Sequence, residues 1–434
     1  MPHFKNRCFG GKVKEERYIT GGGLKIYGIK NPASHGFFAS LFLRSGSMHE
    51  GEGECGITHF LEHVLIKNVN AVMDGKLYET LDRYGLEFNA GTYSDMVQFY
   101  ISGAAKNASL GLEILSCLLS EIKLSRADID TERDRVKAEI REASERTTLF
   151  GFTMPIVHGD TSLSRPITGS AADVSRITLK GLSQYRRRVF SKENIFFYLT
   201  GNFSDGDVKR LGELSDAYPL SVGYRAQNIA PVPKDFMNRP LAVHVKGADF
   251  CAVRFTFDVD TSKYTLAELD LLYDVLLSGY NSRFFIEMSE KRGLFYDTSG
   301  SLDRYRNIGT LHFTYELRGD NLHRALRETV GILNGIKRDL LTDGECMKAG
   351  YTDNVYMLFD DNRELNFTFA YDNHIMGANY STVEERRGAY ESVTPERIRE
   401  IAGEIFVLRN LTFTMKGKRK TDTTALREIL SELG

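Results

Sequence analysis

Residues 56–65 read GITHFLEHVL, a stretch that places two histidines and a glutamate on one short run of helix. On an α-helix His59 and His63 are four residues apart and share a face, so both imidazoles can reach one metal ion. Glu62 lies on the same side and can take a proton from a water at the metal without being a ligand. Two imidazoles, one carboxylate and an open fourth position form the donor set of a hydrolytic zinc site. The alternative is a buried helix face with two incidental histidines, which is disfavoured because the chain has 10 histidines in 434 residues.

The composition is that of an ordinary soluble globular protein, with 42% hydrophobic and 26% charged residues. Its length allows two to four domains with sizeable cores. The formal net charge of −2 gives no basic field for nucleic acid or for an anionic membrane surface. The five cysteines are scattered and odd in number, and the N-terminus has no apolar signal core. No run is long enough to span a bilayer, so we expect a cytoplasmic protein without nucleic-acid or membrane partners.

Cys55 lies four residues before His59, which raises the question of a redox-sensitive thiol near the metal. A small buried side chain that fills the loop before a helix is the more common role at such a position. Spacing alone cannot show a lowered thiol pKa, so we favour the packing role.

The first half of the chain alternates between strand and helix patterns, which predicts an α+β fold. A strand, a glycine turn and a strand are expected over residues 18–29, and a central strand over residues 37–43. Further expected elements are helices at 76–84, 109–122, 127–146 and 179–190, and strands at 86–92, 96–101 and 195–200.

The charged helix at residues 127–146 is a candidate source of a third ligand. Glu132 and Glu139 are seven residues apart and project from one face, along which Val136 and Ile140 suggest burial. A buried carboxylate needs a cation or hydrogen-bond donors, and a metal would answer that need. The residues alone do not choose among Glu132, Glu139 and Glu142.

The second half of the chain repeats the pattern of the first. A shift of 216 residues aligns Phe190, Asn194, Phe197 and Gly201 with Phe406, Asn410, Phe413 and Gly417, and a shift of 214 aligns 97–99 with 311–313 and Asn107 with Asn321. We infer a duplicated domain with boundaries at 1–218 and 241–434, joined by a Pro-containing linker at 219–240. The counterpart of the histidine helix, near residues 266–273, has no histidine. One zinc ion per chain is therefore expected, in the first half.

An ordered set of motifs over nearly the whole chain resembles the pitrilysin/insulinase family of zinc metallopeptidases, which includes the mitochondrial processing peptidases. The motifs are Gly46-Ser47-x-x-Glu50, His59-x-x-Glu62-His63, Asn89-Ala90-x-Thr92, the pair Glu132 and Glu139, Arg165-Pro166-x-x-Gly169, Ser282-Arg283 and Arg292-x-x-x-Tyr296. The order His-x-x-Glu-His is the inverse of the zincin motif His-Glu-x-x-His. The resemblance implies a fold of two homologous α/β-roll domains, each an antiparallel sheet covered by helices. It also implies that the chain forms half of a clamshell, as in the short bacterial branch.

The resemblance also implies a role for each matched residue. His59, His63 and Glu139 would be the zinc ligands and Glu62 the general base, while Glu132 would hold a ligand imidazole in its orientation. Asn89 and Ala90 would take a peptide substrate as an added strand. Arg292 and Tyr296 would bind or polarise substrate carbonyl groups. An ion pair within its own charged helix end is the alternative role for Arg292.

The implied function is zinc-dependent hydrolysis of peptides or unfolded segments in a chamber that two facing chains enclose. We expect a homodimer, or a heterodimer with a related subunit. One alternative is a peptide-binding or scaffolding subunit with little activity of its own; another is a metallo-hydrolase that acts on something other than peptides.

Overall fold

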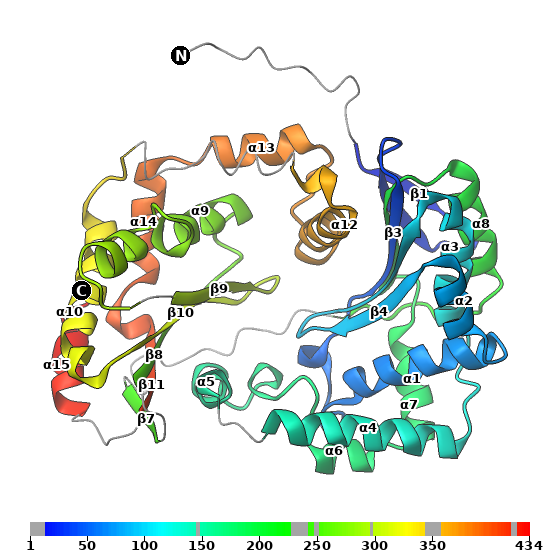
Figure 1. Cartoon of the computed structure of the whole chain (residues 1–434), viewed down its shortest axis with the longest axis horizontal. Coiled ribbons are helices and arrows are strands. Elements are labelled where there is room, and N and C mark those ends of the chain that lie inside the picture. The colour runs from blue at the N-terminus through cyan, green and yellow to red at the C-terminus, as the bar shows by residue number, and fades with distance from the viewer. Residues whose placement is uncertain are drawn as a thin grey trace.

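The protein is described by a computed structural model that covers residues 14–144, 148–226, 242–246, 251–295, 298–342, 357–417 and 423–434, without the side chains of Ser144 and of residues 242–246. Two β-sheets face each other across the middle of the molecule, each with a layer of helices on its outer face (Figure 1). The two lobes are therefore built as mixed α and β layers, as the sequence predicts.

The first lobe is a six-stranded sheet in the order β1-β2-β6-β3-β5-β4. Its core lies between the sheet and the outer helices and is formed by apolar side chains such as Leu41, Phe60, Phe99 and Phe197. The elements of this half are β1 (Glu16–Ile19), β2 (Lys25–Lys30), β3 (Gly36–Leu43), α1 (Ile57–Val72), α2 (Leu77–Tyr84), β4 (Glu87–Thr92), β5 (Val97–Ala104), α3 (Ala108–Ser116), α4 (Arg126–Ser144), α5 (Leu149–His158), α6 (Ala171–Arg176), α7 (Leu179–Val189), β6 (Ile195–Gly201) and α8 (Asp205–Asp216).

The second lobe is a five-stranded sheet in the order β7-β11-β8-β10-β9. Its own core includes Phe255, Phe313 and Phe413 of the sheet and Leu272 and Leu333 of the outer helices. The elements of this half are β7 (Ala242–Lys246), β8 (Cys251–Val259), α9 (Leu266–Leu277), β9 (Thr298–Arg304), β10 (Gly309–Leu317), α10 (Leu322–Arg338), α12 (Asn362–Ala370), α13 (Val383–Glu391), α14 (Pro395–Ile405), β11 (Leu411–Gly417) and α15 (Thr423–Ser431).

The strand register reproduces the two offsets found in the sequence. Leu41 of β3 pairs with Phe99 and Phe197, and Phe255 of β8, 214 residues further on, pairs with Phe313 and Phe413. The described sheets are antiparallel as predicted, except for one parallel pair in each, β2 with β6 and β7 with β11. Parallel pairing needs a long connection between the two strands, and the chain passes through several helices before β6 and before β11.

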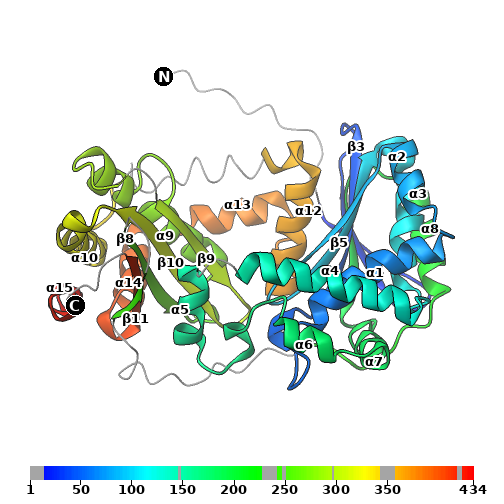
Figure 2. The ribbon, with the colours of Figure 1, turned by 60° about the horizontal axis from the view of Figure 1, so that its bottom comes forward.

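The two halves exchange a helix. Helix α12 of the second half packs on the inner face of the first sheet, where Leu365 and Phe369 join a core with Phe42 and Tyr198. Helix α5 of the first half packs on the second sheet, where Thr153 hydrogen-bonds Thr414 at 2.6 Å. Both views show these two helices between the facing sheets (Figures 1 and 2). The exchange ties the two lobes together.

One predicted helix is shorter than expected. The helix predicted at 109–122 ends as α3 at Ser116 and continues only as a 3₁₀ turn over Cys117–Leu119. The buried Asn68 side chain donates to Ser120 Oγ and to the carbonyl of Glu121, and accepts from the amide of Lys123. These bonds hold the following residues in an extended path.

The predicted boundaries at 218 and 241 stay a prediction, and most of the predicted linker lies outside the described residues. Within the part of the chain that the structure describes, no helix is long and apolar enough to cross a membrane.

Candidate active site

Helix α1 carries both histidines, and its start is fixed by close backbone contacts. Gly56 precedes the helix with a φ of 79°, and a Cβ there would lie 2.5 Å from the carbonyl oxygen of Thr168. Gly169 has a φ of 66°, and a Cβ there would lie 2.9 Å from both the carbonyl oxygen of Cys55 and the Cα of Gly56. Only glycine fits such a contact at positive φ, so the Arg-Pro-x-x-Gly motif serves to seat the helix.

The buried carboxylate of Glu50 caps the same helix. Its two oxygens accept the amides of Gly56 and Thr58, each at 2.9 Å. These amides lack partners within the helix, and a carboxylate is favoured at the positive end of the helix dipole. The Gly-Ser-x-x-Glu phrase therefore also acts on α1, and Thr58 lies in its first turn.

The structure brings His59, His63 and Glu139 together, although α1 and α4 are far apart in the sequence. Nε2 of His59 lies 3.7 Å from Oε1 of Glu139, and Nε2 of His63 lies 3.5 Å from Oε2. Candidate ligand atoms of the three residues all lie within 4.8 Å of one another, and they form the one such group among the described residues. Of the three carboxylates considered on α4, Glu139 is the one in this group.

The arrangement fits a zinc ion. Two donors about 2.1 Å from a tetrahedral zinc are about 3.4 Å apart, close to the distances between the Glu139 oxygens and the imidazoles. Those distances are too long for hydrogen bonds, so the three side chains do not satisfy one another. Burial, together with the neighbouring His63, lowers the pKa of His59 to about 4, which leaves the neutral imidazole that a metal requires.

Glu62 is 8% exposed and points towards the last residue of β4. The hydroxyl of Thr92 donates to its Oε2 at 2.6 Å. Burial raises the pKa of Glu62, and the hydrogen bond from Thr92 acts in the opposite direction. A buried carboxylate held in this way has the features of a general base beside a metal centre.

Glu132 lies on the other side of His63. Its Oε2 is 3.9 Å from Nδ1 of His63, beyond hydrogen-bond range, while Lys67 and Arg135 pair with the same carboxylate at 3.2 and 3.3 Å. Glu132 is 3% exposed, so these two cations balance a buried charge. The placement is compatible with the predicted orienting role, which stays a prediction.

Asn89 and Ala90 lie on β4, the edge strand of the first sheet. Asn89 is exposed, and its Oδ1 accepts the amide of Ala90 at 2.8 Å. Ala90 and Thr92 are two residues apart and therefore share a face of the strand. Among the described strands, β4 thus connects the sheet edge directly to the residue that hydrogen-bonds Glu62.

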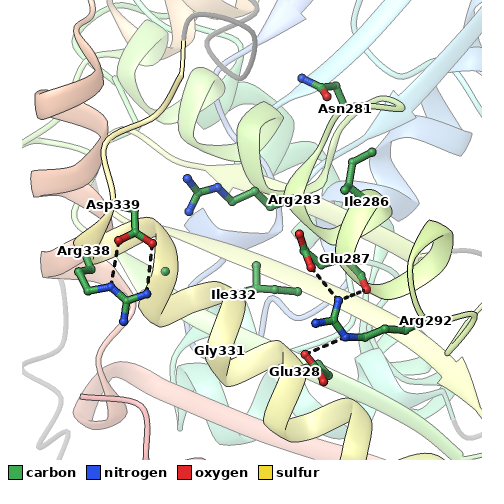
Figure 3. Close-up of a pocket in the computed structure, with 11 residues that line it drawn as sticks. Asn281, Arg283, Ile286, Glu287, Arg292, Glu328, Gly331, Ile332, Arg338 and Asp339 are labelled. Carbon is green, nitrogen blue, oxygen red and sulfur yellow. Dashed lines mark hydrogen bonds and ion pairs between the residues drawn. The ribbon is translucent and has the colours of Figure 1, made fainter.

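Arg292 lies in the second lobe, beside α10, and is not brought to the histidines. It pairs with Glu287 at 2.7 Å and with Glu328 of α10 at 3.0 Å, on the wall of a cavity of about 470 Å³ (Figure 3). Helix α10 lies in the lobe opposite α1 in both views (Figures 1 and 2). Tyr296 lies outside the described residues.

Cys55 is half-buried, and burial, together with the nearby Asp173, raises the pKa of its thiol to about 11. A thiol with a raised pKa is a poor nucleophile near neutral pH, which agrees with the packing role.

Two residues of this site were not assigned a role from the sequence. Thr92 was noted within a motif, but nothing in the pattern shows that its hydroxyl reaches Glu62. Lys67 lies four residues after His63 on α1, and this helical spacing was a signal that it could reach the carboxylate beside His63.

Comparisons with known proteins agree with this architecture. The family model described as "Insulinase (Peptidase family M16)" matches residues 26–170, and the model described as "Peptidase M16 inactive domain" matches residues 176–349. A relative from Mycobacterium tuberculosis, named as an uncharacterized zinc protease, is 25% identical over 339 residues, which are 75% of each chain.

Solved structures share the fold. A structure from Pseudomonas fluorescens, described as a peptidase M16 inactive domain, has a TM-score of 0.82 at 16% identity and covers 94% of this chain and 99% of its own. The periplasmic protease PqqL from Escherichia coli has a TM-score of 0.76 at 17% identity, and the match covers 96% of this chain but 50% of PqqL.

Two facing α+β lobes, with a His-x-x-Glu-His helix in one of them, define a class of metallopeptidase folds. Because the two family models together span most of the chain, the protein belongs to the insulinase family of peptidases, family M16.

Proposed function

We propose that this protein is a zinc-dependent endopeptidase that hydrolyses peptides or unfolded segments. The observation that carries the proposal is the meeting of His59, His63 and Glu139 with the buried, hydrogen-bonded Glu62 beside them. The relative named as a zinc protease supports the same metal and the same reaction class.

His59, His63 and Glu139 would hold the zinc ion, one per chain. The bound ion supplies a Lewis acid that lowers the pKa of water towards neutrality. Glu62 takes the proton of the attacking water and returns it to the nitrogen of the leaving amine. Thr92 hydrogen-bonds Oε2 of Glu62 and so holds the carboxylate in position for this proton transfer.

The substrate would bind as an extra strand along β4. An edge strand offers backbone groups to an extended peptide, and such pairing favours peptides over other substrates. The amide of Ala90 is held by Asn89, so an added strand must displace this side chain or share its contact. This arrangement supports a substrate-binding role for Asn89 and Ala90 and weighs against a hydrolase for non-peptide substrates.

Two chains would face each other to complete the active particle. Arg292, the residue predicted to act on substrate carbonyl groups, lies in the lobe opposite the histidines of its own chain. The match to PqqL supports the same idea, because this chain covers only 50% of that longer single chain. A homodimer is favoured over a heterodimer because the zinc set and Arg292 with Tyr296 occur in one chain. The cytoplasmic location stays a prediction.

The direct test is a Glu62→Gln variant purified without any partner. We expect the variant to bind one zinc ion per chain and to keep the melting temperature (Tm) of the wild type, while hydrolysis of quenched peptides is lost. Treatment of the wild type with a chelator should abolish hydrolysis, and added zinc should restore it. Undiminished turnover by Glu62→Gln would refute the assignment.

The competing proposal is a peptide-binding subunit with little activity of its own. The ion pairs of Arg292 with Glu287 and Glu328 favour it, because they occupy the residue expected to act on substrate. The pure wild-type chain distinguishes the two proposals: metal-dependent cleavage supports the peptidase, and peptide binding without cleavage supports the subunit. Efficient cleavage of a large folded protein would contradict the enclosed chamber.

A further inference from the structure

A small cavity that the proposed peptidase chemistry does not use lies between the two lobes. Its volume is about 40 Å³, and its lining includes Arg44 at the end of β3, Arg225 after α8, and Arg306 at the tip of the β9–β10 hairpin. A buried water needs about 10–15 Å³ of such space, so the cavity can hold a few waters or one small ion. Residues of both lobes therefore converge on it.

The lining has an excess of positive charge. Within the described part of the chain, the structure gives neither Arg225 nor Arg306 a carboxylate partner within ion-pair distance. Burial, followed by the nearby charge of Arg225 and also that of Arg306, lowers the pKa of Arg44 to about 10. Arg44 therefore lies within reach of the charges of both other arginines, in a lining where neither of those two has a carboxylate partner among the described residues.

The nearby acidic groups have other partners. Asp95, the one carboxylate in the lining, lies 2.9 Å from the hydroxyl of Tyr371. Glu15, close to the lining residue His374, pairs with its Nε2 at 3.1 Å. The lining therefore holds three arginines and one carboxylate, which is already hydrogen-bonded.

Arg44 is fixed so that part of its guanidinium group is left for a ligand. Nε donates to the carbonyl of His374 and Nη1 to that of Glu193, each at 3.0 Å, and the group lies 4.4 Å from the ring centre of Phe196. Nη2 has no acceptor among the described residues, and a guanidinium edge suits a planar or tetrahedral oxyanion.

We propose that this cavity binds a small oxyanion, of the phosphate or carboxylate class, which bridges Arg44 and Arg225 to Arg306 and so joins the two lobes. The site lies apart from the cluster of His59, His63 and Glu139, and its occupancy does not depend on the proposed hydrolysis. An oxyanion here would offset the unfavourable effect of Arg225 and Arg306 on Arg44 and add charge-assisted hydrogen bonds across the lobe contact.

The test measures the Tm of the full chain in inorganic phosphate, in acetate, and in chloride at equal ionic strength. Binding to the folded state should raise the Tm by about 2 °C or more in phosphate or acetate relative to chloride. The larger of the two shifts identifies the preferred oxyanion. Arg306→Gln and, separately, Arg225→Gln should lose at least half of the shift.

The stability of the variants in chloride, without an oxyanion, provides a second and more specific test. In chloride alone, Arg306→Gln should be at least as stable as the wild type, because a positive charge that acts unfavourably on Arg44 is gone. Arg409→Gln, at an exposed arginine that forms no ion pair with any described residue, should respond to phosphate as the wild type does. Phosphate bound at the metal centre would shift all these proteins equally.

The inference is overturned if Arg306→Gln and Arg225→Gln keep the full oxyanion shift, or if neither oxyanion exceeds chloride in the wild type. Loss of folding by either variant in chloride would also overturn it, since the arginines would then stabilise the fold without an anion. Isothermal titration of the wild type with phosphate should detect binding that Arg306→Gln weakens at least tenfold.

Discussion

At the scale of single residues, the site depends on contacts that identity and spacing do not reveal. The sequence shows that Glu62 shares a helix face with His59 and His63, because helical geometry is regular. It does not show which strand residue meets Glu62, because that contact depends on how β4 crosses α1. Thr92 is that residue, and its hydroxyl is one of the groups that counter the rise in the pKa of Glu62 on burial.

Thr92→Val should impair catalysis while leaving the metal site intact. Valine keeps the shape but removes the hydroxyl, and a hydrogen bond to a charged group contributes about 1.5–3 kcal/mol. We expect kcat to fall by roughly tenfold or more, with KM for a peptide and zinc content nearly unchanged. Thr92→Ser, which retains the hydroxyl, should restore most of the rate. Wild-type kcat in Thr92→Val would show that the hydrogen bond does not position Glu62.

At the scale of elements, repetition was the most informative signal. The offsets of 214 and 216 residues correspond to aligned strands, and Asn194 and Asn410 each donate to the carbonyl five residues earlier at 2.9 Å. The exchange of α5 and α12 could not be predicted, because an amphipathic pattern shows that a face is buried but not which sheet buries it. The choice of Glu139 likewise needed the family resemblance, since Glu132 and Glu139 share a helix face.

Gly169→Ala should weaken the metal site through the start of α1. A Cβ at this position would lie 2.9 Å from the carbonyl oxygen of Cys55, at a φ of 66° that strains any L-residue. We expect the free energy of unfolding to fall by about 2 kcal/mol or more, together with a lower affinity for zinc.

Gly85→Ala is the matched control for that variant. Gly85 has a φ of 61° at the end of α2, but a Cβ there would meet nothing within 4 Å. The free energy of unfolding of Gly85→Ala should fall by only about 1 kcal/mol, the cost of placing a residue with a Cβ at positive φ. Its zinc affinity should equal that of the wild type. Equal effects of the two substitutions on zinc binding would exclude the proposed seating of α1 by Gly169.

At the scale of the whole molecule, polar contacts join the lobes in addition to the apolar core that α12 forms with the first sheet. Asp95, in the turn between β4 and β5, is 7% exposed, and the hydroxyl of Tyr371 lies 2.9 Å from its carboxylate and 2.6 Å from the carbonyl of Arg304. Burial raises the pKa of Asp95 to about 6. The contact between lobes therefore includes a carboxyl group that titrates below neutral pH.

Asp95→Asn should change how stability depends on pH. A carboxyl group whose folded pKa is raised stabilises the fold when protonated, and this contribution is lost as pH rises from the unfolded pKa of 3.8 through about 6. Asparagine keeps an acceptor for Tyr371 and does not titrate. The free energy of unfolding of the wild type relative to the variant should therefore fall by about 2 kcal/mol between pH 4.5 and pH 7.5, with a matching fall in relative Tm. A constant difference across this range would contradict the raised pKa.

The proposed pairing of two chains makes a prediction that a single mutant cannot test. If Arg292 acts on substrate held by the partner, then Glu62→Gln and Arg292→Ala should each reduce activity strongly when alone. Mixing the two variants creates dimers in which an intact Glu62 of one chain meets an intact Arg292 of the other. Random exchange makes half of the dimers mixed, with one complete site of two, so about a quarter of wild-type activity should return.

The same mixture separates the alternatives for Arg292. If the arginine acts within its own chain, each mixed dimer holds one chain without a base and one without the arginine, and no activity returns. If its ion pairs with Glu287 and Glu328 are its whole function, Arg292→Ala alone should keep its catalytic rate and lose only stability. Size-exclusion chromatography of the mixture with one chain tagged confirms that exchange has occurred. Activity therefore returns only if the chains form dimers and Arg292 of one chain acts on the substrate held by the other.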